Sequence, residues 1–218
     1  LLCFDLEKES DRAKFHFSII GGTPEAAGSA VARQTVLFTP RGSKGLHGCS
    51  ASILDDSHAL TAQHCIVGAE KIDPVLVFAT SYTEDAPVRS VTAMKSPSDS
   101  VQDDIAVLTF AGGLPEGYKA VALSAKSLPL QGMLITQAGY GVQSETPPDG
   151  RGVLRSVVTP ILMVDPATHL YTAGAAGKSV CGGDSGGPDF ANVDGELIQV
   201  GVHSTGSCGH GGSTSENA

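Results

Sequence analysis

Apolar residues occur along this chain in short runs rather than in long amphipathic stretches. Runs rich in β-branched residues are broken by turn residues, and the sequence contains 27 glycines and 12 prolines. This pattern favours many short β-strands over long helices. The sequence therefore predicts an all-β sandwich or barrel, with strands expected at residues 31–38, 75–79, 88–94, 105–110, 133–138, 153–163 and 197–204.

The strand pattern falls into two halves behind a charged N-terminal segment. Residues 1–18 are largely charged and are interpreted as a leader or propeptide. Residues 111–131 are rich in glycine and proline, which is typical of a link between two structural units. We therefore expect an N-terminal β-domain at 19–115 and a C-terminal β-domain at 116–218, with residues 209–218 as a flexible tail.

Composition limits the classes of partner. With 218 residues, 41% of them hydrophobic and 17% charged, the chain can bury a sizeable core. The formal net charge of −9 argues against nucleic acid and anionic membranes, because such partners require a basic patch. The sequence also lacks the run of about 18 apolar residues that a membrane-spanning helix needs.

The five cysteines point to an oxidising compartment. They show neither a Cys-x-x-Cys pair nor the His/Cys spacing of zinc sites, so no metal is predicted. Two disulfides and one spare cysteine fit better and indicate a secreted protein, extracellular or periplasmic. Cys3, near the terminus, is the expected spare, and it could join two chains or stay free.

Three residues are candidates for chemistry. Ser185 stands among glycines that leave room for close backbone approach, as a positioned nucleophile requires. His64 lies beside Cys65, and Asp104 stands at the mouth of an apolar strand, where a carboxylate needs a partner such as a histidine N–H. Taken singly, each has an ordinary alternative: a loop serine, a structural histidine or a turn acid.

Four motifs taken together resemble a known family. Ile19-Ile20-Gly21-Gly22, Thr61-Ala62-Gln63-His64-Cys65, Asp104-Ile105-Ala106-Val107-Leu108 and Gly183-Asp184-Ser185-Gly186-Gly187-Pro188 occur in the order and at the separations of the trypsin and chymotrypsin family of serine proteases. The chain resembles a bacterial-type secreted member in zymogen form. The resemblance implies two six-stranded antiparallel β-barrels with the active site in the cleft between them. It also implies a C-terminal strand and helix, for which the sequence shows no match.

The resemblance implies a serine endopeptidase with polypeptide substrates and no cofactor. Ser185 would attack, His64 would take and return its proton, and Asp104 would hold the imidazole in the right tautomer. The backbone N–H groups of Gly183 and Ser185 would form the oxyanion hole. The family's disulfides would join Cys49 to Cys65 and Cys181 to Cys208. The alternative is a protease-fold binding protein without activity.

The resemblance also implies activation by cleavage. A new amino terminus at Ile19 would pair with Asp184, and His47 matches a histidine that can hold that aspartate before cleavage. The bond before Ile19 does not follow Lys or Arg, so the activating protease would not be trypsin-like. We therefore expect the uncleaved chain to have an assembled triad but a badly formed oxyanion hole at Gly183.

Substrate-binding residues follow from the same resemblance. Ser179 would form the neutral base of the primary pocket, which disfavours a basic residue before the scissile bond. Ser204 would support Asp104, and the segment Ser204, Thr205 and Gly206 would bind the substrate backbone by β-augmentation. His203 matches a histidine of glutamate-specific relatives, so an acidic preference and an apolar or small-residue preference both stay open.

Overall fold

The fold is described from a computed structural model of the chain. The structure describes residues 19–43, 48–71, 73–97, 103–124, 130–145, 148–206, 208 and 213–217. The predicted leader at residues 1–18 lies outside this part. The described residues form β-strands and two single turns of 3-10 helix, η1 (Gln63–Cys65) and η2 (Ala69–Lys71). None of the helical segments described is long and apolar enough to cross a membrane.

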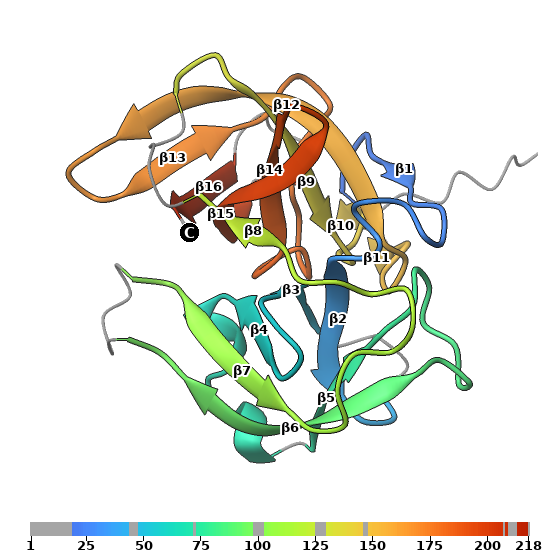
Figure 1. Cartoon of the computed structure of the whole chain (residues 1–218). Coiled ribbons are helices and arrows are strands. Elements are labelled where there is room, and N and C mark those ends of the chain that lie inside the picture. The colour runs from blue at the N-terminus through green and yellow to red at the C-terminus, as the bar shows by residue number, and fades with distance from the viewer. Residues whose placement is uncertain are drawn as a thin grey trace, which may run out of the picture.

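The N-terminal half is a closed barrel of antiparallel strands (Figure 1). β2 pairs with both β3 and β5, which closes the ring in the order β2-β3-β4-β7-β6-β5. Apolar side chains of these strands, including Val36, Ile53, Leu76 and Leu108, fill the interior. The strands are β2 (Thr35–Pro40), β3 (Cys49–Ile53), β4 (His58–Thr61), β5 (Pro74–Val77), β6 (Val88–Lys95) and β7 (Ala106–Phe110).

The C-terminal half is a second, strongly curved sheet. Its main path runs β12-β13-β16-β15-β14-β9, and β9 also pairs with β12, so the path returns on itself. Its strands are β9 (Leu134–Gly139), β12 (Arg155–Asp165), β13 (Leu170–Ala173), β14 (Pro188–Val193), β15 (Glu196–Gly206) and β16 (Ser213–Asn217). The short strands β1 (Thr23–Pro24) and β8 (Ala122–Leu123) extend it, and β10 (Ser144–Glu145) pairs with β11 (Pro148–Asp149) in a separate hairpin.

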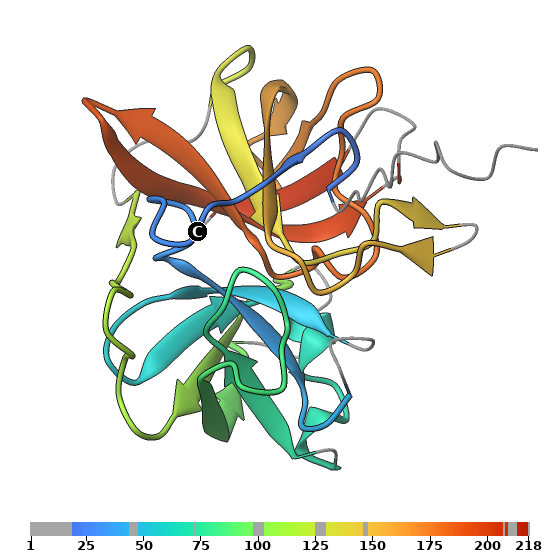
Figure 2. The ribbon, with the colours of Figure 1, turned by 90° about the vertical axis from the view of Figure 1, so that its right-hand side faces the viewer.

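The two halves share a core where they face each other. A cluster containing Leu37, Val77, Tyr140 and Phe190 joins residues from both. The fully buried Tyr140 hydroxyl donates to the backbone oxygen of Ala79 at 2.9 Å, which fastens the second sheet to the barrel. Seen from the side in Figure 2, the barrel and the second sheet are stacked, and the β10–β11 hairpin projects near their junction.

The C-terminal end of the chain differs from the sequence-based expectation. Residues 209–218 were expected to form a flexible tail, but Ser213–Asn217 form β16 between β13 and β15. The segment is polar, so hydrophobic periodicity gives no strand signal there. The open edges of two neighbouring strands supply its hydrogen bonds instead, and only the folded structure brings those edges together.

Candidate active site

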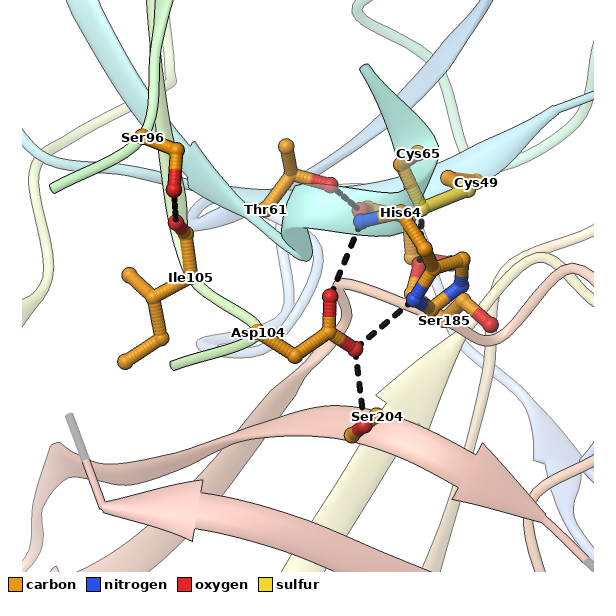
Figure 3. A network of polar contacts seen from close by, with 10 residues as sticks. Cys49, Thr61, His64, Cys65, Ser96, Asp104, Ile105, Ser185 and Ser204 are labelled. Carbon is orange, nitrogen blue, oxygen red and sulfur yellow. Dashed lines mark hydrogen bonds and ion pairs between the residues drawn. A yellow bond between two sulfur atoms is a disulfide. The ribbon is translucent and has the colours of Figure 1, made fainter. Parts of the chain in front are cut away.

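Three polar residues from separate segments meet where the two halves face each other. His64 lies in η1, the turn that follows β4, and Asp104 lies just before β7. Ser185 lies in the turn that leads into β14 of the second sheet. Figure 3 shows the Ser185 side chain beside the His64 ring, on the side away from Asp104.

Two disulfides fix the segments around these residues. Cys49 of β3 is joined to Cys65 of η1, so the turn that carries His64 is tied to the barrel wall. The sulfur of Cys65 also lies 3.7 Å from the backbone oxygen of Ser185. The second disulfide joins Cys181, four residues before Ser185, to Cys208 beyond β15.

The His64 ring is oriented by Asp104. His64 Nδ1 lies 2.7 Å from Asp104 Oδ2, and the backbone N–H of His64 donates to Oδ1 at 2.8 Å. The Ser204 hydroxyl donates to Oδ2 at 2.7 Å. Since a carboxylate only accepts hydrogen bonds, Nδ1 carries the proton and the Nε2 lone pair is left to act as a base.

The environment keeps Asp104 ionised. Its side chain is 7% exposed, while that of His64 is 47% exposed. Burial alone would raise the pKa of Asp104, but hydrogen bonds from the side chain and backbone of His64 and from Ser204 lower it below its ordinary value. A stable negative charge therefore lies next to Nδ1 of the ring.

The turn that carries Ser185 is held from both sides. Its backbone oxygen accepts from the Ser50 N–H at 2.8 Å, and the Gly186 N–H donates to the His203 oxygen at 2.7 Å. Gly186 has φ 77°, which favours glycine. A Cβ there would collide with the Thr61 hydroxyl and would lie 2.5 Å from the Ser50 oxygen.

The backbone donors beside Ser185 are open. The Gly182 oxygen accepts from the Val142 N–H at 2.8 Å, and in a trans peptide the Gly183 N–H then points the opposite way. Within the described residues, neither the Gly183 N–H nor the Ser185 N–H has a protein acceptor. Both N–H groups are therefore available to a substrate oxygen, while a badly formed oxyanion hole in the uncleaved chain stays a prediction.

Asp184 is fully buried between backbone donors. Its carboxylate accepts from the Gly141 N–H at 2.8 Å and from the Cys181 N–H at 2.9 Å. Burial raises the pKa of Asp184 to about 6, against the lowering effects of those N–H groups, His203 and Arg151. A carboxylate in this state would gain from a further cationic partner.

The candidate new terminus lies close to this region. Ile19 is fully buried and packs against Val157 and Val180, and Ile20 forms a bridge with Ser179. The chain at Ile19 is thus already buried against the second half, beside the segment that leads to Asp184. His47, the predicted partner of Asp184 before cleavage, lies outside the described residues.

The segment expected to bind the substrate backbone ends β15. The last β14–β15 pair joins Pro188 to Val202, so Ser204, Thr205 and Gly206 extend beyond β14. On the other side, Thr205 and Gly206 pair with β16. Among the described strands, one edge of this segment therefore has no partner strand, as addition of a substrate strand requires.

The predicted base of the primary pocket and its neighbours are closely packed. Ser179 is fully buried, and Val180 is 2% exposed. A Cβ built on Gly206 would lie 2.5 Å from the Val180 oxygen and 2.8 Å from its Cγ2. Gly206 therefore lies directly against Val180, and a side chain at position 206 would collide with it.

His203 lies in surroundings that the sequence did not predict. It was predicted to bind a substrate carboxylate, but its side chain is 1% exposed and both ring nitrogens have protein partners. Its partners are Asp189 and the backbone oxygen of Asp184, and the motifs missed Asp189 and the Tyr171 that bonds to it. The carboxylate of Asp189 four residues after Ser185 was the available signal.

A cavity of about 220 Å³ is lined by His64 and by other residues of the N-terminal half. Its lining is largely apolar and includes Phe38, Ala69, Pro74 and the Cys49–Cys65 disulfide. The cluster of Cys49, His64 and Cys65 has the proximity of a metal site, but its two sulfurs are bonded to each other and are not thiolate ligands.

Comparison with known proteins decides the family. A family model described as Trypsin matches residues 19–215. The chain belongs to the trypsin family. It is 28% identical over 215 residues to Trypsin-1 of Astacus astacus, which covers 86% of this chain and 89% of that protein. It is 30% identical over 191 residues to Brachyurin of Leptuca pugilator, with 78% of this chain and 80% of that protein covered.

A third relative is Spermosin of Halocynthia roretzi, 28% identical over 192 residues, with 75% of this chain and 49% of that protein covered.

Membership of the family makes this chain a trypsin-family serine endopeptidase. The trypsin fold implies two barrels, one of which is the closed six-stranded ring of the N-terminal half. The relatives named here are eukaryotic, so the bacterial type stays a prediction.

Proposed function

We propose that this trypsin-family protein hydrolyses peptide bonds through Ser185, His64 and Asp104 and an acyl-enzyme. The observation that carries this proposal is the bonded set of Asp104 and His64 with Ser185 beside the ring. A serine hydroxyl is a weak nucleophile at neutral pH, so a base of this kind is needed.

The proposed reaction uses these groups in two halves. Ser185 Oγ bonds to the carbonyl carbon while its proton moves to His64 Nε2, and the oxygen that becomes negative accepts from the N–H groups of Gly183 and Ser185. His64 then gives the proton to the leaving amine as the C–N bond breaks. Water then attacks the carbonyl carbon of the acyl-enzyme ester while His64 takes its proton. As the ester bond breaks, His64 returns the proton to Ser185 Oγ, and the carboxylic acid product leaves.

Activation is proposed to follow cleavage before Ile19. The new ammonium group would add an ion pair to the buried carboxylate of Asp184, whose charge is already favoured by backbone N–H groups and by the nearby charges of His203 and Arg151. Ile19 already packs beside Val180, so a short rearrangement would bring its nitrogen to the carboxylate. The protein would then be secreted as a zymogen and processed by another protease.

A fluorophosphonate probe tests the function and the activation together. A variant in which residues 14–18 are replaced by Asp-Asp-Asp-Asp-Lys can be cut before Ile19 by enteropeptidase. We expect the cut protein to be labelled at Ser185, located by peptide mass spectrometry, and to react at least about tenfold faster than the uncut protein, because of the added ion pair at Asp184.

Heat-unfolded protein is the control for non-specific labelling. Absence of label in the cut, folded protein would favour the binding-protein alternative. Equal labelling rates before and after the cut would contradict the zymogen proposal but leave the endopeptidase proposal intact.

Small residues are proposed as the preferred side chains before the scissile bond. Val180 fills the space against Gly206, and Ser179 beneath it is neutral and buried. A basic or large side chain would have to displace Val180. His203 offers no free N–H for an acidic side chain, so the geometry favours the small-residue alternative over the acidic one.

Shortening Val180 should widen this preference. For the cut enzyme we expect Val180→Ala to raise kcat/KM for leucine relative to alanine before the scissile bond by about tenfold or more, because a few methyl groups in a pocket are worth that much. A peptide-library cleavage profile measures the ratio. Val158→Ala is a matched control, since Val158 is 50% exposed on β12, and it should leave the profile unchanged. Efficient cleavage after arginine by the unaltered enzyme would contradict the proposed preference for small residues before the scissile bond.

A further inference from the structure

A buried polar network lies directly behind the turn that carries Ser185. His203 Nε2 lies 2.7 Å from Asp189 Oδ1, and the Tyr171 hydroxyl donates to Asp189 Oδ2 at 2.6 Å. The side chains of His203 and Asp189 are 1% and 0% exposed, and Tyr171 is equally hidden. Three polar side chains on β13, β14 and β15 are therefore sealed in the sheet, and the proposed catalytic steps use none of them.

The hydrogen-bond partners determine the protonation of the ring. The second ring nitrogen of His203, Nδ1, lies 3.1 Å from the backbone oxygen of Asp184. A carbonyl oxygen and a carboxylate both only accept, so the ring satisfies them together only when both nitrogens carry protons. Burial lowers the pKa of His203, but the charge and hydrogen bond of Asp189 and the nearness of Asp184 raise it above its ordinary value. The pair is a buried imidazolium and carboxylate.

The Asp184 carbonyl is part of the frame around Ser185. It also accepts from the Gly187 N–H at 2.9 Å, and the backbone of His203 accepts from Gly186 at 2.7 Å and donates to Gly187 at 2.9 Å. A Cβ on Gly187 would lie 3.0 Å from His203 Nδ1, so the ring fits closely under the turn. The imidazolium thus bonds to the peptide that immediately precedes the nucleophile.

We propose that His203 is a positioning residue that holds the Asp184–Ser185 peptide, and with it Ser185 and its N–H donor, through its Nδ1–H. Asp189 keeps the ring charged and oriented, and Tyr171 fixes Asp189 in turn. This role rests on the proposed catalytic function of Ser185. This positioning role takes the place of the substrate-carboxylate contact that the family resemblance left open for His203.

The charge on the ring makes the role dependent on pH. The titratable groups that face His203 are Asp189 on β14, Tyr171 on β13 and Asp184 in the turn, and Arg151 acts on Asp184. Because the folded pKa of His203 is raised, the stabilisation is fully present below the ordinary value for histidine and is lost as the pH rises through the raised value. Loss of the proton removes one donor, so turnover should fall on the alkaline side.

Nitrogen NMR of the protein labelled in its histidines tests the ring directly. At neutral pH we expect both nitrogens of His203 to carry protons, assigned by comparison with His203→Gln. A ring with one protonated nitrogen would overturn the proposal, whatever the activity of the enzyme. If the cut wild-type protein reacts with no substrate, the proposed function fails, but this measurement of the ring still stands.

Kinetics of the cut enzyme test the consequence. His203→Gln should lower kcat by about tenfold to a hundredfold, as expected for a small displacement of a nucleophile, and should leave KM within about twofold. Its pH profile should lose one alkaline step, while any step from the Ile19 amine is common to both proteins. His58→Gln is the matched control, because it removes the exposed ion pair of His58 with Asp55, and it should change neither kcat nor the profile.

A second variant keeps the test independent of how well His203→Gln folds. Asp189→Asn removes the charge that raises the pKa of His203, so the alkaline step should move to lower pH rather than disappear. A uniform loss of kcat at every pH in both variants, with the step unmoved in Asp189→Asn, would show that the network is merely structural and would overturn the proposal.

Discussion

Replacing Ser185 with alanine should lower kcat of the cut enzyme by about a million-fold, because a triad acts as a unit and loses its chemistry when the nucleophile is absent. The structure gives the reason for so large an effect. Ser185 lies beside a ring whose other nitrogen is bonded to a buried carboxylate (Figure 3). Hydrolysis of a peptide p-nitroanilide by the cut variant measures the loss.

The expected loss is non-additive with that of its base. His64→Ala should cost about as much as Ser185→Ala, and the double variant should lose little more. Ser57→Ala is the control, since the Ser57 hydroxyl contacts only its sequence neighbours Asp55 and His58 among the described residues. Retention of more than about 1% of the wild-type kcat by Ser185→Ala would show that another group is the nucleophile.

The candidate catalytic residues could be predicted because each stands in a short local motif. Taken singly, His64 beside a cysteine and Asp104 before an apolar strand have ordinary alternatives, so it was the order and separation of the four motifs that pointed to a catalytic set. Strand order and closure were available only through the family resemblance, because pairings such as β2 with β5 join residues that lie far apart in the sequence.

The packing around the predicted primary pocket and the buried network could not be predicted, because both depend on how side chains pack in space. Nothing in the sequence places Val180 against Gly206, and the pairing of His203 with Asp189 depends on the register of β14 and β15. A histidine at this position can contact substrate only if its ring nitrogens are free. Here Asp189 occupies Nε2 and the backbone oxygen of Asp184 occupies Nδ1.

Strand β16 shows a related limit of the sequence pattern. Its strand character comes from the edges of β13 and β15, not from its own residues. Its presence also bears on the site, because it pairs with Thr205 and Gly206 and fixes the segment proposed to receive substrate. A part of the chain first interpreted as a tail therefore contributes to the proposed binding edge.

Replacing Asp104 with asparagine should lower kcat by about ten-thousand-fold, with little change in KM. Three donors now converge on the carboxylate: the backbone N–H and the Nδ1–H of His64, and the Ser204 hydroxyl. An amide has a single oxygen, which would accept from the backbone N–H and turn the NH₂ group toward the ring. Nδ1 would then have to accept a hydrogen bond, which moves the ring proton to Nε2.

A ring protonated at Nε2 cannot take the proton of Ser185, so the size of this effect tests the tautomer as well as the residue. Asp103→Asn is the matched control, because Asp103 is the exposed neighbour in the same acidic pair, and its kcat should stay within about twofold of wild type. Thermal unfolding of both variants checks that the fold is intact. If a folded Asp104→Asn enzyme kept its kcat within about tenfold, Asp104 would be a structural acid that caps β7, and His64 would need another group to orient it.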